Sequence, residues 1–183
     1  MSFSLREEEK KLLLATARES IRSRLIGEPP AYAPPTGNLR TRCGAFVTLH
    51  RSGELRGCIG HITGIKALPE AVRELARSSA FQDPRFPPLT LDELPEIDIE
   101  ISVLTPLKKI VSPTEVELGR HGVLIESGSR SGVLLPQVPV EQGWDREEFL
   151  RHLCYKAGLP PESLNLPETV LSTFEAIIFG EKE

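Results

Sequence analysis

The stretch RCGAFVTLHRSGELRGCIG, residues 42–60, predicts a β-hairpin. Its two halves are rich in β-branched and aromatic residues, and Ser52-Gly53 stands between them as a two-residue turn signal. A loop of this length places Arg51 opposite Glu54. The chain therefore contains at least one antiparallel pair of strands.

The same register predicts the surroundings of Cys58. It places Val47 opposite Cys58, and Cys43 then lies four residues farther along the partner strand. Four residues span about 13 Å in a strand, which is too far for a disulfide between Cys43 and Cys58. Strict alternation also puts Arg56 on the same face of the strand as Cys58.

Cys58 is a candidate functional residue because it lies between two glycines. A thiol reacts as the thiolate, and a nearby cation such as Arg56 favours that form. Gly57 and Gly60 remove side chains beside the sulfur, and their amides would form a concavity that receives an anion. The alternative is a buried structural cysteine in a tight turn, since free cysteine is among the most buried residue types.

Three segments outside the hairpin have the apolar spacing and end signals of helices. The first begins where Ser4 and Glu7 match a capping box, and it ends at Gly27. The second starts near Pro69. The third follows Asp145, which is a good N-cap residue.

Three further segments predict strands. Residues 96–107, EIDIEISVLTPL, alternate between apolar and polar side chains, as in a strand with one buried face. Residues 121–138 predict a second hairpin with a loop from Gly128 to Gly132, and residues 169–181 predict one closing strand. Because helices alternate with antiparallel hairpins, the predicted fold class is α+β.

The composition of the 183 residues is that of an ordinary globular protein, with 39% hydrophobic and 26% charged residues. A net charge of −4 argues against a nucleic-acid partner, because phosphate binding needs clustered positive charge. Apolar runs are too short to span a membrane, and the N-terminal stretch lacks the apolar core of a signal peptide. Three cysteines do not make a disulfide framework. We therefore expect a cytoplasmic protein.

Glu100 and His121 are candidates for acid–base chemistry. Glu100 lies on the polar face of the predicted strand, which is either solvated or lines a cleft. His121 precedes a glycine at the entrance of the second hairpin, and histidine titrates near neutral pH. The alternative for a lone histidine is a hydrogen-bonded structural role.

Arg85 is a candidate ligand for an anion. The segment DPRFPPL, residues 83–89, holds it in a loop stiffened by prolines, and the arginine fork suits a carboxylate or a phosphate. The alternative is an ion pair with Asp83 or with a neighbouring carboxylate.

No metal site and no cofactor are predicted. Cys58 and His61 have metal-ligand spacing, but they form only one close pair, whereas a structural zinc needs four ligands. Phosphate-binding and dinucleotide-binding fingerprints are not found in the sequence.

Four blocks of the sequence carry a family resemblance. They are GAFVTLHRSGELRGCIGH (44–61), DPRFPPLTLDELPEIDIEISVLTP (83–106), HGVLIESGSRSGVLLPQVPVEQGWDREEFLRHLCYKAGL (121–159) and FEAIIFGE (174–181). Together they closely resemble the AMMECR family, whose bacterial and archaeal members are called AmmeMemoRadiSam system protein A. The hexapeptide LRGCIG is the signature of that family, and the resemblance runs from about residue 10 to the C-terminus.

The resemblance implies one domain, residues 1–183, made of two lobes whose boundary the sequence does not show. The larger lobe would hold an antiparallel sheet flanked by helices, the smaller would also be α+β, and a cleft would lie between them. The resemblance also implies a genomic association with a Memo-type protein and a radical-SAM protein, which are the expected partners. It does not imply a particular reaction.

Two functions follow from these observations. In an enzyme or enzyme component, Cys58 is the nucleophile or covalent acceptor, and Glu100 or His121 is the acid–base group. The residues that would bind the ligand are Arg56, Gly57, Gly60 and Arg85. In the alternative, a non-catalytic subunit binds a small molecule, a peptide end or one of the partners.

Overall fold

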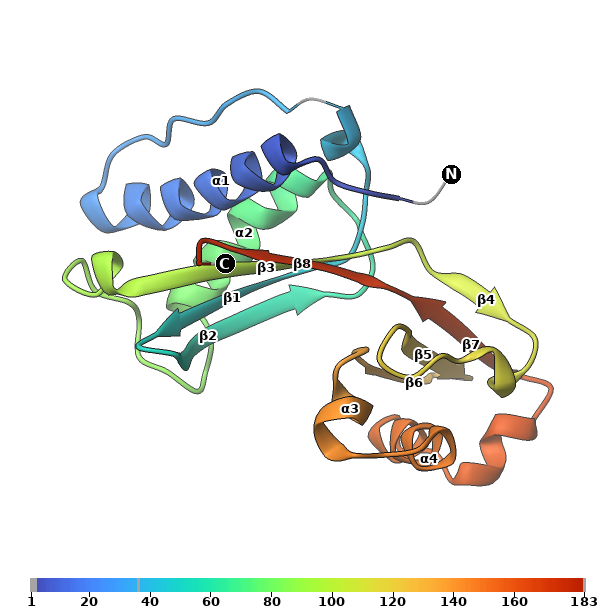
Figure 1. Ribbon diagram of the computed structural model, residues 1–183. Coiled ribbons are helices and arrows are strands. Elements are labelled where there is room, and N and C mark those ends of the chain that lie inside the picture. The colour runs from blue at the N-terminus through green and yellow to red at the C-terminus, as the bar shows by residue number, and fades with distance from the viewer. Residues whose placement is uncertain (1–2, 36, 183) are drawn as a thin grey trace. The chain divides into compact units, whose positions relative to one another are not determined.

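The computed structural model describes residues 3–35 and 37–182, which form two compact units (Figure 1). The first unit contains the residues up to Leu104 together with the C-terminal residues from Ile177, and the second contains Thr105–Ala176. The described residues form four α-helices and two four-stranded antiparallel sheets. The predicted α+β class is confirmed, and the cleft stays a prediction.

The first helix, α1, Glu7–Ile26, begins later than predicted. The backbone N–H of Arg6 donates to Glu9 Oε2 over 2.8 Å, so Arg6 is the N-cap and the predicted Ser4–Glu7 capping box is wrong. The end at Gly27 is confirmed, with the left-handed φ of 72° that favours glycine. Helix α1 is the longest helix, and none in the described residues is both long and apolar enough to cross a membrane.

The first unit is a sheet with helices on one face (Figure 1). Its elements are β1 Ala45–Arg51, β2 Glu54–His61, α2 Leu68–Phe81, β3 Ile97–Leu104 and β8 Ala176–Gly180. The strand order is β2-β1-β3-β8, so β2 lies at an edge. Alternate residues of β1 and β3 are buried beneath α1 and α2, which confirms the alternation predicted for β3.

The β1–β2 hairpin forms around the predicted turn, but its register changes along the strands. Thr48, not Val47, lies opposite Cys58. The change occurs because the two neighbours of Arg56 pair with consecutive residues of β1, which leaves Arg56 as the extra residue of a β-bulge. The predicted register assumed a regular ladder and is therefore wrong by one residue at Cys58.

The second unit contains the other sheet and two helices. Its elements are β4 Lys108–Ile110, β5 Gly122–Ser127, β6 Arg130–Leu134, α3 Val138–Gln142, α4 Arg146–Lys156 and β7 Thr169–Phe174. The strand order is β4-β7-β5-β6. Asp145 Oδ1 accepts the backbone N–H of Glu148 over 2.8 Å, so the predicted N-cap of α4 is confirmed.

Two predicted strand boundaries are wrong. The second hairpin turns at Gly128-Ser129, because β6 already begins at Arg130. The predicted closing strand is two strands, β7 and β8, which belong to different sheets and are separated by Glu175. The N–H of Glu175 donates to the side-chain hydroxyl of Thr105, and its carbonyl accepts from the Thr105 N–H, each over 2.8 Å. The Thr105 hydroxyl thus accepts a hydrogen bond in place of a backbone carbonyl where the chain leaves the second sheet.

Gly57 allows α2 to approach β2 closely. A Cβ on Gly57 would lie 2.1 Å from the carbonyl oxygen of Ser79 in α2. The Ser79 hydroxyl donates to the Val47 carbonyl over 2.7 Å and accepts the N–H of Ile59 over 2.9 Å. One buried serine therefore joins α2 to both strands of the hairpin.

We expect Gly57→Ala to lower the free energy of unfolding by about 2–3 kcal/mol, because the added methyl group would overlap a backbone carbonyl. Urea unfolding measures this change. The matched control is Gly180→Ala, where a Cβ would make only ordinary contacts at 3.5 Å and where we expect a change below about 0.5 kcal/mol. Equal losses in the two variants would contradict the role assigned to Gly57.

Candidate functional site

The face of the first sheet opposite α1 and α2 carries the polar side chains of the hairpin and of β3. Directly opposed residues of antiparallel strands project to the same face, so the pairing assigns the members of this open face. They are Phe46, Thr48, His50, Leu55, Cys58, Gly60, Asp98, Glu100 and Ser102. Leu55 is exposed, and the others are partly exposed. The open face therefore carries the side chains of this unit that can take part in chemistry.

Cys58, Thr48 and Glu100 form a row across this face. Thr48 lies opposite Cys58 on one side and opposite Glu100 on the other. The Thr48 hydroxyl and the Cys58 sulfur are hydrogen-bonded at 3.2 Å, and either atom can donate. Two strand spacings, about 10 Å, separate the Cα atoms of Cys58 and Glu100. The structure thus brings two predicted site residues onto one face, with a hydroxyl between them.

His50 also lies on the open face, although no sequence signal indicated an acid–base role for it. It lies two positions from Thr48 and opposite Asp98. A surface pocket of about 270 Å³ is lined by His50, Asp98 and Glu100, together with the C-terminal end of β8. Asp98 is ion-paired with Lys182. Alternation along β1 places Thr48 and His50 on one face, but their position beside Cys58 depends on the bulge.

His121 lies in the second unit, and its contacts there are local. Its ring Nδ1 accepts the backbone N–H of Glu117 over 3.1 Å, and the backbone N–H of His121 donates to the Glu117 carbonyl over 2.9 Å. These bonds close the turn before β5. The first unit therefore brings Cys58 and Glu100 together without His121, and an acid–base role for His121 stays a prediction.

Asp83 and Arg85 bind the backbone of Cys58 at the outer edge of β2, which is the edge strand of the sheet. Asp83 Oδ2 accepts the Cys58 N–H over 2.9 Å, and Arg85 Nη2 approaches the Cys58 carbonyl at 3.4 Å. Arg85 and Asp83 are ion-paired at 2.7 Å, so this alternative for Arg85 is confirmed. The Arg85 guanidinium holds the pKa of Asp83 well below its usual range, helped by the Cys58 N–H and opposed by burial.

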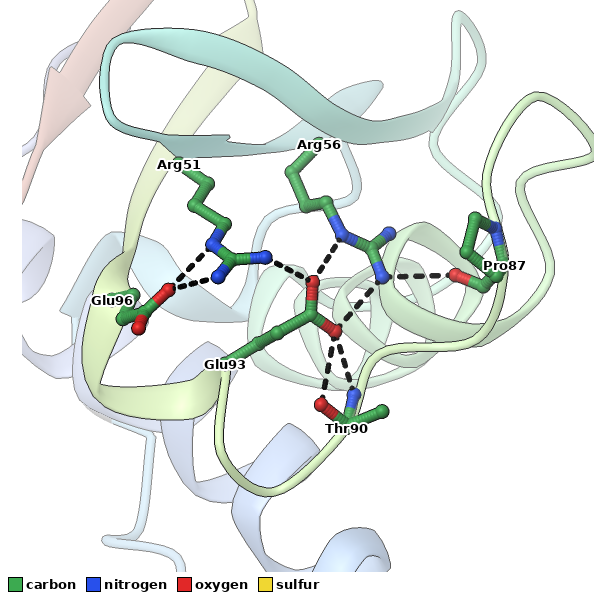
Figure 2. A network of polar contacts seen from close by, with 6 residues as sticks. All are labelled: Arg51, Arg56, Pro87, Thr90, Glu93 and Glu96. Atoms are coloured by element: carbon green, nitrogen blue, oxygen red, sulfur yellow. Dashed lines mark hydrogen bonds and ion pairs between the residues drawn. The ribbon is translucent and has the colours of Figure 1, made fainter.

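Arg56 is buried and binds the loop that runs along the same edge. Its guanidinium donates to both oxygens of Glu93, over 2.9 and 3.1 Å, and to the Pro87 carbonyl over 3.0 Å (Figure 2). Arg51 adds a second guanidinium to Glu93 at 3.0 Å. The Arg56 hydrogen bonds, with those of Thr90, lower the pKa of Glu93 to about 2 against the effect of burial. The positive charge predicted to favour a thiolate is thus paired with a carboxylate.

The space beside the two glycines is filled by the protein itself. Gly57 faces the Ser79 carbonyl, and a Cβ on Gly60 would lie 2.2 Å from the Phe46 ring. The two amides between the glycines are also engaged, because Cys58 donates to Asp83 and the next residue donates to Ser79. These contacts explain both glycines by packing, and their predicted ligand-binding roles stay predictions.

Cys43 and Cys154 contrast with Cys58. Both are free and buried, and burial raises the pKa of each thiol. Cys58 is also free but partly exposed. Within the described ranges, the ligand types His, Cys, Asp and Glu form no group of three or more that would hold a metal ion.

The fold and the site define an α+β protein with a partly exposed thiol on the open face of an antiparallel sheet. The family model AMMECR1 matches residues 14–179, and the chain belongs to the AMMECR1 family. Protein MK0488 of Methanopyrus kandleri is 48% identical over 193 residues, which cover 100% of this chain and 93% of that protein. Protein MJ0810 of Methanocaldococcus jannaschii is 45% identical over 184 residues, covering 96% and 92%.

A solved structure shares the fold. The crystal structure of the uncharacterized protein PH0010 from Pyrococcus horikoshii matches with a TM-score of 0.83 and 42% sequence identity, and the match covers 98% of this chain and 95% of that one. The names of these relatives state no activity.

We expect Glu93→Gln to lower the free energy of unfolding at pH 7 by about 2–3 kcal/mol, because Arg56 would stay buried without a counter-charge. The folded pKa of Glu93, about 2, lies below the ordinary value of 4.5. Its contribution is therefore present above the ordinary pKa and is lost as the pH falls from 4.5 towards 2. Urea unfolding between pH 7 and pH 3 measures the narrowing difference between the variant and the wild type.

Glu96→Gln is the control for this experiment. Glu96 pairs with Arg51 and is 52% exposed, so its loss should change stability by about 0.5 kcal/mol or less. If the free energy of unfolding depended on pH in the same way in both variants, the stabilising role assigned to the Arg56–Glu93 pair would be contradicted.

Proposed function

We propose that the protein is an enzyme, or the catalytic component of one, in which Cys58 is the nucleophile or covalent acceptor. The observation that supports this most is the hydrogen bond between the Cys58 sulfur and the Thr48 hydroxyl on a partly exposed face. A hydroxyl that donates to sulfur stabilises the thiolate, which is the reactive form. The other two cysteines of the chain are buried.

Glu100 and His50 are the acid–base groups that this proposal favours. Both line the 270 Å³ pocket on the open face, and Glu100 shares the row of Cys58. The lining of this pocket does not include Cys58, so a substrate bonded to the sulfur would extend past Thr48 to exchange a proton with either group. The pairing of Arg56 with Glu93 makes Arg56 a positioning residue for the β2 edge in this scheme.

The partners of the reaction are proposed from the family resemblance. A Memo-type protein and a radical-SAM protein would act with this chain, as the name AmmeMemoRadiSam system protein A indicates for family members that carry the LRGCIG hexapeptide. A cytoplasmic location fits three free cysteines, which a reducing compartment keeps as thiols.

A non-catalytic binding subunit is the second candidate, and one observation favours it. The motif residues around Cys58 already have partners within the protein: Gly57 packs on α2, Gly60 packs on Phe46, and Arg56 binds Glu93. In this case the open face would bind a small molecule, a peptide end or one of the two partners without chemistry at sulfur.

We expect iodoacetamide to alkylate Cys58 in the folded protein faster than Cys43 and Cys154, since those two are buried. Thr48→Val should slow the alkylation of Cys58 about tenfold, because the thiolate that attacks the reagent would lose the hydroxyl that can donate to it. Mass mapping of tryptic peptides over time measures each rate. Ser102→Ala removes a hydroxyl from the same face at a position opposite Phe46 and should leave the rate unchanged. An unchanged rate in Thr48→Val would remove the support that this hydroxyl gives to the proposal.

Cys58→Ala separates the two candidate functions. In a strain that lacks the native gene, the variant should fail to restore the wild-type phenotype if Cys58 is catalytic. Co-purification with the Memo-type protein of the same genome should persist in the variant. Full restoration by Cys58→Ala would favour the binding subunit. Substitutions of Gly57 cannot make this distinction, because they disturb the contact with α2.

A further inference from the structure

Arginine and aromatic side chains line two adjoining surface pockets on the helical side of the first unit. Tyr32, Arg73 and Arg77 border a pocket of about 240 Å³. Arg77 also borders the next pocket, of about 400 Å³, together with Arg24 and Phe81. Because Arg77 belongs to both, we treat these five residues as one site and call it the arginine groove.

The arginine groove follows one side of α2. Arg73, Arg77 and Phe81 are spaced four residues apart, which places them in line on a helix over about 12 Å. The guanidinium carbon of Arg73 lies 3.8 Å from the centre of the Tyr32 ring, and that of Arg24 lies 5.4 Å from the centre of the Phe81 ring. Aromatic faces orient a guanidinium without neutralising its charge.

The three arginines of the groove have no carboxylate partner among the residues that the structure describes. Most other arginines of this unit do, as Arg18 and Arg22 show. The two carboxylates that border the groove, Glu70 and Glu74, are both bound by Lys66 instead. Arg73 and Arg77 carry like charges four residues apart on α2, so they also repel each other. Lys66 offsets only one of the two carboxylate charges, but the three arginines and Lys66 together still outnumber Glu70 and Glu74. A net positive charge therefore remains for an external anion.

The Nε atom of Arg73 adds a second observation. It is buried and has no hydrogen-bond partner within the described residues. An unpaired buried donor costs free energy, so a charged donor of this kind needs an explanation. Because this atom is itself buried, it does not contact an external ligand. Stacking on Tyr32 holds the guanidinium in one orientation despite the unpaired Nε.

We propose that the arginine groove binds an acidic peptide segment of a partner protein. A row of about 12 Å matches about four residues of extended chain at 3.3 Å each. Carboxylates of the peptide would bind the arginine forks, and its apolar side chains would pack on the rings of Tyr32 and Phe81. Arginine and aromatic residues are also the types enriched at protein interfaces.

A compact phosphate group suits this place less well. Arg24 lies in the last turn of α1, and Phe81 is the last residue of α2. These helix ends present no free N–H groups to cradle a phosphate, and their negative partial charge acts on any anion. The length of the row, about 12 Å, is therefore what favours an extended acidic segment over one compact group. The proposal is also independent of the thiol chemistry, because the arginine groove lies on the helical side of the sheet and Cys58 on the open face.

The test is a binding measurement with the full chain and a fluorescein-labelled random copolymer of glutamate and tyrosine, followed by fluorescence anisotropy. The copolymer presents many acidic and aromatic sequences at once. We expect saturable binding that weakens with added salt. Arg77→Glu should weaken it at least tenfold, and Arg77→Lys, which keeps the charge but loses the fork, should weaken it less. Arg40→Glu makes the same charge change at an exposed arginine outside the groove and should alter binding less than twofold.

Three results would overturn the proposal. The first is that the glutamate–tyrosine copolymer does not bind. The second is that Arg77→Glu and Arg40→Glu weaken binding equally, which would indicate a nonspecific effect of net charge. The third is that tripolyphosphate displaces the labelled copolymer more effectively than unlabelled copolymer does, when both competitors are compared at equal concentrations of negative charges. That result would assign the groove to a compact polyphosphate. Circular dichroism and urea unfolding of each variant show that the fold is retained.

Discussion

The contact between Ser79 of α2 and the backbone of β2 is the constraint on which the rest of the first unit depends. It exists only because Gly57 has no side chain, and it ties the helix to both strands of the hairpin. The chain then leaves α2 directly into the loop that brings Asp83 and Glu93 back to the edge of the same strand. Helix, hairpin and loop are thus positioned by one close approach.

The charged residues around the LRGCIG hexapeptide close the edge of the sheet. An edge strand exposes unpaired N–H and C=O groups, which other chains can pair with. Here Asp83 and Arg85 bind the backbone of Cys58, while Arg56 and Glu93 hold the loop over the strand. The charge of the hexapeptide is consequently used inside the protein. Near the hexapeptide, the side chains that remain for another molecule are those on the open face.

The candidate site was predictable in part. Cys58 and Glu100 were recognised because flanking glycines and strict alternation are local signals. Thr48 and His50 were not selected, although they lie on a strand whose existence was predicted. Their position beside Cys58 depends on the bulge at Arg56, which shifts the pairing by one residue. Alternation in a sequence carries no mark of such an extra residue.

The sequence by itself determined the local elements and the family: the turn of the first hairpin, the buried face of β3, the N-cap of α4 and the α+β class. These follow from patterns within a few residues of one another. Only the tertiary structure decided the register at Cys58, the division of the closing strand between two sheets, and the partners of each charge. The carboxylates that bind Cys58 and Arg56 lie 25 and 37 residues away in the chain. Sequence separations of this size carry no local signal, and the packing of α2 against Gly57 places the loop that holds these two carboxylates beside β2.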